Sequence, residues 1–341
     1  MSSSTNNISL RRALQVPWAS ILLGAVLLCV ALSILQPSFF SATNFKNILQ
    51  QSSFSAIIAV GMTFVIMTGG IDISVGMSVF LMCAGMYVMS RSLPPAAVLM
   101  FAISGGVLVG LLNGFLICIL RINSIIATLS TLSICRGLAY LLIQSQLRVI
   151  PTPFRIIGTS NVAGIIPLPV LMMIAAGVLG YFLLRKTRFG RYVLAIGNSA
   201  VSARESGIPI FKMQFMTYAL CGLCAGIAST IYIGRLGIVQ TDTAWGVEFT
   251  VITAVVLGGT KLSGGRGTVT GSIIGCIFLT LIENALNLME VSGFYYDVVR
   301  GSILVIAVII EAVSNWRQTK ALLNERSRRL RQFELAREEE K

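Results

Sequence analysis

A polar turn lies between two long apolar runs early in the chain. Residues 67–76 read MTGGIDISVG, so two glycines and the carboxylate of Asp72 stand next to segments apolar enough for a membrane. A charge near hydrocarbon is costly and is usually retained for a helix cap, a partner contact or a transport path. Asp72 comes directly before Ile73, where we expect the next helix to begin. Its carboxylate is therefore predicted to accept the free N–H groups of that helix, at the positive end of the helix dipole.

A second glycine-rich turn, over residues 258–267, reads GGTKLSGGRG. It contains Lys261 and Arg266, and basic residues beside an apolar run are typical of a cytoplasmic turn. Neither turn has the spacing of a phosphate-binding loop, so nucleotide binding is not predicted at either. The turn or gate residues that we single out are Gly69, Gly70, Asp72, Ser74, Gly76, Gly258, Gly259, Gly264, Gly265, Arg266 and Gly267.

Polar side chains also occur inside the apolar runs. Glu283, Asn287 and Glu290 recur at i, i+4 and i+7, which places them on one face of a helix. Such groups can line the path of a small polar solute. Alternatively they bond neighbouring helices to one another, at about 1 kcal/mol each. The candidate path residues are Asn113, Arg136, Glu283, Asn284 and Asn287.

Residue sets that would support catalysis or nucleotide binding are missing from the sequence. It has no G-x-x-x-x-G-K-[S/T] run, so any ATP-driven work must come from another subunit. It has no histidine, and therefore no Ser/His/Asp, Cys/His or H-E-x-x-H set. The seven cysteines include one C-x-x-C pair, Cys221 and Cys224, with no second ligand pair. We expect buried structural cysteines, no metal, no cofactor bound by this chain and no enzyme activity.

The composition identifies the elements that must position these residues. Hydrophobic residues make up 55% of the chain and charged residues 11%, which excludes a soluble globular domain. We predict an all-α polytopic membrane protein with about ten transmembrane helices of about 20 residues each. The apolar segments are 18–35, 54–68, 73–90, 96–120, 125–143, 165–184, 213–233, 247–257, 269–288 and 296–316.

The basic residues indicate how the chain is oriented. The formal charge of +13 gathers at the ends of apolar segments rather than on one polar face, so a nucleic-acid partner is not predicted. The side of the termini carries eleven basic residues before the tail: Arg11, Arg12, Arg121, Arg185, Lys186, Arg188, Arg191, Arg204, Lys212, Lys261 and Arg266. The other side carries five: Lys46, Arg91, Arg148, Arg155 and Arg235. Both termini are therefore predicted to be cytoplasmic.

This topology divides the chain into three parts. Residues 1–16 form a cytoplasmic N-terminal segment, residues 17–316 the transmembrane domain, and residues 317–341 a charged cytoplasmic tail. The longest cytoplasmic loop, 185–212, contains N-cap candidates at Asn198 and Ser199, followed by a short helix. Gly207 and the proline two residues beyond it would end that helix. Two interpretations remain open: the helix is a contact site for another protein, or it only reverses the direction of the chain.

Three separate motifs resemble the signatures of ribose-type permeases of bacterial ABC importers. They are GMTFVIMTGGIDISVG at 61–76, AIGNSAVSARESGI at 195–208 and VVLGGTKLSGGRGTVTGSIIG at 255–275. The resemblance covers about 39–311. It implies a multi-pass subunit of the bacterial inner membrane that contacts membrane lipid, pairs with ABC ATPase subunits that use ATP, and receives a sugar-like solute from a periplasmic solute-binding protein. It also implies pairing with a second permease copy or a paralogue.

The resemblance assigns coupling to the ATPase to Asn198, Ser199, Ser202, Arg204, Glu205, Ser206 and Gly207. Ala200 stands where that family usually has Glu, and Arg204 or Glu205 would have to supply the missing charge contact. Glu283 stands where Asn is usual. The alternative function is a self-sufficient secondary transporter or channel for a small polar solute. A coupled carrier would normally show several carboxylates deep in its helices, whereas Glu283 is the one clear mid-run candidate.

Overall fold

The computed structural model describes residues 17–293, 295–313, 316–317 and 320. The predicted N-terminal segment 1–16 lies outside the described residues, as does the tail 317–341 apart from residues 317 and 320. Among the described residues, six helices are long and apolar enough to cross a membrane. They are α3 (Ala42–Met67), α5 (Pro95–Gly114) with the π-helical turn η2 (Phe115–Ile119), α6 (Ser124–Ile143), α8 (Leu168–Lys186), α11 (Ile210–Leu236) and α13 (Val269–Leu288).

Further helices are shorter or join the long ones. The apolar helices α2 (Pro17–Leu35), α4 (Val75–Met89) and α12 (Val247–Leu257) follow the predicted segments, and another helix covers 295–313. Connecting elements are η1 (Pro37–Phe39), η3 (Thr152–Arg155), α7 (Ile156–Thr159), α9 (Arg188–Asn198) and α10 (Ala200–Glu205). The predicted all-α polytopic membrane architecture is confirmed. The number of crossings and the side of the termini stay predictions.

Two pairs of very short strands occur in the connections, and the sequence did not indicate them. β1 (Arg148–Val149) pairs antiparallel with β4 (Ile238–Val239). β2 (Asn161–Val162) pairs antiparallel with β3 (Ile166–Pro167). The first pair fastens the segment after α6 to the segment after α11.

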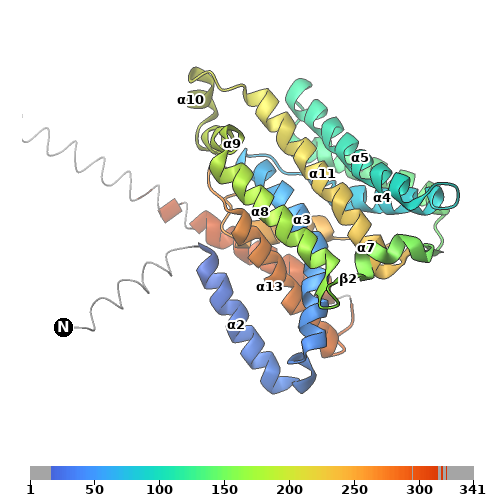
Figure 1. The fold of residues 1–341 in the computed structure, drawn as a ribbon. Helices are drawn as coiled ribbons and strands as arrows, with labels where there is room; N and C mark the ends of the chain where they lie inside the picture. The colour runs from blue at the N-terminus through green and yellow to red at the C-terminus, as the bar shows by residue number, and fades with distance from the viewer. Residues whose placement is uncertain (1–16, 294, 314–315, 318–319, 321–341) are drawn as a thin grey trace, which may run out of the picture.

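The helices pack around α3 and α11, and Figure 1 shows α11 running beside α5. The contact between α5 and α11 is close because glycines face each other across it. A Cβ added at Gly106 would lie 2.7 Å from the backbone of Gly226, and one at Gly110 would lie 3.1 Å from the Cα of Gly222. Small residues allow helices in lipid to approach in this way, since helix association there depends on close packing.

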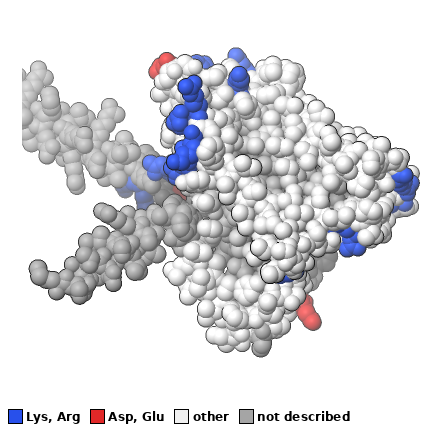
Figure 2. Space-filling view, viewed as in Figure 1, with Lys and Arg blue, Asp and Glu red and all other residues white. Residues whose placement is uncertain are grey.

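Charged side chains collect at opposite ends of the molecule. In Figure 2, blue side chains lie at the end that carries α9 and α10 and at the opposite end, with an almost uncharged surface between them. Exposed large hydrophobic residues such as Leu108, Leu141 and Leu179 cover the long helices. Since the bilayer solvates apolar surface, this distribution fits a membrane-embedded belt.

Candidate functional site

The two glycine-rich turns meet each other and the end of α9. The backbone N–H of Gly265 donates to the carbonyl oxygen of Met67 at 3.0 Å. Gly197, in the last turn of α9, packs against both groups so closely that an added Cβ would clash with them. The two predicted turns and the loop 185–212 therefore form one junction, made mainly of backbone. Gly197 was missed as a site residue because its role depends on distant partners.

The two turns also begin in the same way. Gly69 follows α3 with φ +81°, and Gly259 follows α12 with φ +87°. The N–H of Gly69 donates to the carbonyl of Ile66, and that of Gly259 donates to the carbonyl of Val256, each at 2.9 Å. Positive φ is available to glycine at little cost, so these residues end their helices with the carbonyl groups satisfied.

The short helix predicted within the loop 185–212 is present as α10. Its N-cap is Ser199, whose Oγ accepts the backbone N–H of Ser202 at 3.2 Å. The alternative cap, Asn198, is corrected: it is the last residue of α9, and its Nδ2 donates to the carbonyl of Leu194 at 2.9 Å. Gly207 has φ +75°, as expected for a residue that ends the helix.

One side of α10 is buried against neighbouring helices, and its other side is exposed. Ala203 is buried against Ile196 of α9 and Ile210 of α11. On the opposite side, Val201 is 69% exposed, and Ser202, Arg204, Glu205 and Ser206 are exposed as well. A short, capped helix that is anchored by the buried Ala203 and exposed on its other side can transmit a force from a bound protein to the junction of the turns.

The position of Asp72 differs from the prediction. α4 begins at Val75 rather than at Ile73, and its N-cap is Ser74. The Asp72 carboxylate accepts the N–H of Ser74 at 3.0 Å and its Oγ–H at 2.6 Å, so it orders the turn ahead of the helix rather than capping the first turn of α4. Asn113 of α5 donates to both carboxylate oxygens, at 3.2 and 3.3 Å.

Asp72 and Asn113 are thus bonded to each other between helices. Asp72 is 2% exposed and Asn113 fully buried. Burial raises the pKa of the Asp72 carboxyl, while the hydrogen bonds from Ser74 and Asn113 act in the opposite direction. Asn113 was a candidate for the solute path, and in this structure its amide bonds to the turn instead.

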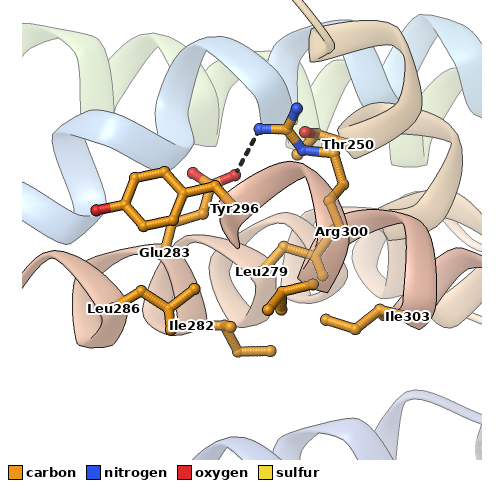
Figure 3. A pocket seen from close by; sticks show the side chains of 9 residues that line it. Thr250, Leu279, Ile282, Glu283, Leu286, Tyr296, Arg300 and Ile303 are labelled. Carbon is orange, nitrogen blue, oxygen red and sulfur yellow. Dashed lines mark hydrogen bonds and ion pairs between the residues drawn. The ribbon is translucent and has the colours of Figure 1, made fainter. Parts of the chain in front are cut away.

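Glu283 belongs to a charged cluster between α13, α3 and helix 295–313. Its Oε1 pairs with Nη2 of Arg300 at 3.2 Å, and its Oε2 accepts from Gln51 at 3.3 Å. Arg300 also pairs with Asp297 through Nη1 at 3.1 Å. Figure 3 shows Arg300 reaching toward Glu283 across a small pocket that Thr250 and Tyr296 also line.

The other polar residues of α13 have separate roles. Asn284 and Asn44 of α3 exchange two amide hydrogen bonds, at 3.0 and 2.9 Å, which joins the two helices. Asn287 is exposed. The predicted shared face does not extend to Glu290, because α13 ends at Leu288 and Glu290 has φ +55° beyond it.

Arg136 lies on α6 next to two aromatic rings. Its Nε donates to Tyr140 Oη at 2.8 Å, and its guanidinium carbon lies 4.5 Å from the centre of the Trp245 ring. Trp245 was missed, since a single tryptophan in a connection gives no pattern. Its neighbour Gly246 adjoins Arg300: a Cβ there would clash with Nη1. The Arg136 and Glu283 positions are therefore linked through Trp245, Gly246 and Arg300.

Glu248 is a second site that sequence reasoning missed. It is 4% exposed in the first turn of α12, and its Oε2 has no hydrogen-bond partner in the described part of the chain. The carboxylate lies against Gly76 at the start of α4, where a Cβ would collide with it. The carboxylate therefore lies near the N-termini of two helices, α12 and α4. The sequence signal that could have identified Glu248 is a single acidic residue at the start of the apolar run 247–257.

The cysteines form no evident reactive site. All seven are free, and all but Cys29 are buried. Within the described residues, no group of three or more His, Cys, Asp or Glu side chains is placed to hold a metal ion.

Comparison with known proteins identifies the family. The model of the family described as branched-chain amino acid transport system / permease component matches residues 44–308. The ribose import permease protein RbsC of Bacillus subtilis is 40% identical over 295 residues, which is 85% of this chain and 91% of that protein. RbsC of Haemophilus influenzae is 34% identical over 94% of this chain and all of that protein.

The L-arabinose transport system permease protein AraH of Escherichia coli is 37% identical over 289 residues, covering 83% of this chain and 87% of that protein. No solved structure matches the chain. These relatives are transport permeases, and they do not favour a self-sufficient secondary transporter or channel. The chain therefore belongs to the family of branched-chain amino acid transport system permease components, and it is a membrane-spanning permease subunit of an ABC importer in the bacterial inner membrane.

Proposed function

We propose that this permease imports a monosaccharide of the pentose class. The observation that carries the proposal is the 40% identity, over 85% of the chain, to a ribose import permease, together with the similarity to L-arabinose permeases. In this proposal a periplasmic solute-binding protein delivers the sugar, and cytoplasmic ABC ATPase subunits supply the energy of ATP hydrolysis. A second copy of this permease, or a paralogue, completes the path.

α10 is the element that docks into the ATPase. The coupling residues are the seven named above from Asn198 to Gly207, and the exposed surface of α10 over its buried Ala203 supports this role. Closure of the ATPase would move α10 and α9 together. Gly197 packs directly on Met67 and Gly265, so it would transmit that movement to the glycine-rich turns. We propose that these turns form the inner gate.

The chain crosses the membrane ten times, with both termini in the cytoplasm. The basic residues support this topology, as do the four helices beyond the six long ones: α2, α4, α12 and the helix over 295–313. In this scheme the connection that contains Ser160 faces the periplasm and α10 faces the cytoplasm. The transmembrane domain covers 17–316, with the coupling loop 185–212 within it.

The solute path is proposed along the polar groups that remain next to exposed surface. Arg136 and the cluster of Glu283 and Arg300 fit this role, since they adjoin exposed residues on α6 and helix 295–313. Asn113 and Asn284 instead bond helices in this structure, so any contact with solute would require these amide bonds to open.

The test is uptake of radiolabelled ribose and L-arabinose by cells with and without this chain, combined with purification of the tagged permease in mild detergent. We expect uptake of at least one pentose to require the chain, and an ATPase subunit to copurify with it. Pentose uptake that is unchanged by deletion would contradict the proposed substrate class. Transport by the purified chain alone, driven by an ion gradient, would contradict the dependence on an ATPase.

A further inference from the structure

Arg136 is a cation inside a helix that is apolar enough to cross the membrane. It lies more than one helical turn from either end of α6 and is only partly buried. Arg136 forms no ion pair with a carboxylate in the described part of the chain. Its position relies on the hydrogen bond to Tyr140 and the contact with Trp245. Because an arginine facing lipid is costly, such residues face the bundle interior or a water-filled cavity.

The residues on both sides of Trp245 have a fixed backbone, and Trp245 itself is nevertheless 48% exposed. Before it, the buried Ala244 donates its N–H to Tyr232 Oη of α11 at 3.1 Å. This bond holds the segment that follows α11 against that helix. After it, Gly246 is the N-cap of α12. Irregular backbone at membrane depth occurs where it is buried in protein or lines a cavity, rather than against lipid.

The surroundings of Trp245 are polar on two sides. Arg136 covers part of the ring from α6, and Arg300 lies beside Gly246 with its partners Glu283 and Asp297. The exposed indole ring lies against the Arg136 guanidinium, and the next residue, Gly246, adjoins Arg300 and Asp297, so an apolar face and hydrogen-bonding groups occur close together. A monosaccharide presents the matching surfaces, since its ring has faces of C–H bonds and an edge of hydroxyl groups.

We propose that Trp245 and Arg136 form a sugar-contact platform in the translocation path of this permease. The indole ring packs against the C–H face of a pentose, and terminal N–H groups of Arg136 donate to its hydroxyl oxygens. The cation–π contact holds both side chains in place before the sugar arrives, so little ordering is needed on contact. This inference rests on the proposed import of a pentose, and it names the residues that touch the sugar.

Thiol labelling tests where Trp245 faces. In a Cys29→Ser background, which removes the one native cysteine that is not buried, Trp245→Cys and Phe182→Cys variants of the complete transporter are treated with a membrane-impermeant thiol reagent. Phe182 is the matched control, an aromatic residue of α8 with 58% exposure. We expect Trp245→Cys to react at least tenfold faster than Phe182→Cys, and 100 mM ribose or L-arabinose to slow it at least threefold. Equal inertness of the two thiols would overturn the proposal.

Transport kinetics test the contact itself. We expect Trp245→Phe to keep the KM for pentose uptake within about threefold, and Trp245→Leu and Arg136→Gln each to raise it at least tenfold. Membrane content should stay unchanged in these variants, and Phe182→Leu should behave as the wild type. If pentose uptake still requires the chain, wild-type KM values in both Trp245→Leu and Arg136→Gln would overturn the proposed platform but leave the proposed substrate class standing. Pentose uptake that does not require the chain would instead reject the proposed substrate.

Discussion

The N–H of Gly265 donates a hydrogen bond to the carbonyl oxygen of Met67, and so joins two turns that are far apart in the sequence. Both turns follow the C-terminal ends of helices, α3 and α12, and both rest on Gly197 of α9. A bond between backbone groups allows little movement, because neither bonded atom belongs to a rotatable side chain. Movement of α9 should therefore reach both turns together.

The first prediction concerns this close contact. In Gly197→Ala the new Cβ would clash with Met67 and Gly265, neither of which can move as a side chain would. We expect destabilisation of about 1–3 kcal/mol from overpacking and at least a tenfold loss of solute-stimulated ATP hydrolysis. Gly137→Ala is the control, since a Cβ there meets no atom within 4 Å. Equal activity of the two variants in liposomes would refute the proposed role of the junction.

The second prediction separates backbone conformation from packing at the end of α10. Gly207 has φ +75°, and a Cβ there would meet no atom within 4 Å, so a substitution acts through the backbone alone. Gly207→Asn should be mild, because Asn tolerates this conformation, whereas Gly207→Val should cost about 1–2 kcal/mol or more. Pull-down of the ATPase should weaken severalfold with Val and little with Asn. If Val binds the ATPase as the wild type does, the shape of α10 is unimportant for docking.

The third prediction concerns the carboxylate of Asp72. Asp72→Asn keeps an acceptor for Ser74, and its amide can pair with the side chain of Asn113, as Asn44 pairs with Asn284. Asp72→Leu leaves the buried N–H and hydroxyl hydrogen of Ser74 without an acceptor, while Asn113 keeps its bond to Ser74 Oγ; the cost is about 1–3 kcal/mol for each unsatisfied group. Thermal unfolding in detergent should show a small change for Asn and a large one for Leu. Loss of transport by a stable Asp72→Asn protein would mean that the charge itself is required.

The fourth prediction addresses the ion pair between Glu283 and Arg300, whose side chains are 25% and 17% exposed. Glu283→Gln and Arg300→Gln should each destabilise the protein, and the double variant should lose less than the two changes added together. The coupling energy is expected at roughly 0.5–3 kcal/mol. Asp297→Asn should change stability little, because Asp297 is 62% exposed. Strict additivity in the cycle would show that the pair contributes nothing to folding.

Features governed by neighbouring residues could be predicted from the sequence. A helix that crosses the membrane needs about 20 predominantly apolar residues, so the apolar runs of the sequence indicate the membrane segments. The N-cap at Ser199 and the positive φ of Gly207 follow from the chemistry of a few adjacent residues, and both are present as expected. The start of α4 was misplaced by two residues, because Asp72 and Ser74 are both suitable residue types for the turn before a helix.

The partner of each polar group was decided only by the tertiary structure. Asn113 contacts Asp72 from 41 residues away and Asn284 contacts Asn44 from 240, whereas Arg136 meets Trp245 in an irregular segment that carries no periodic signal. Helix-bonding and path-lining residues share the same amino-acid types, so the sequence cannot separate them. The packing of helices that are distant in the chain determines whether a polar side chain reaches another helix or stays on an exposed surface, and that packing depends on all of the helices at once.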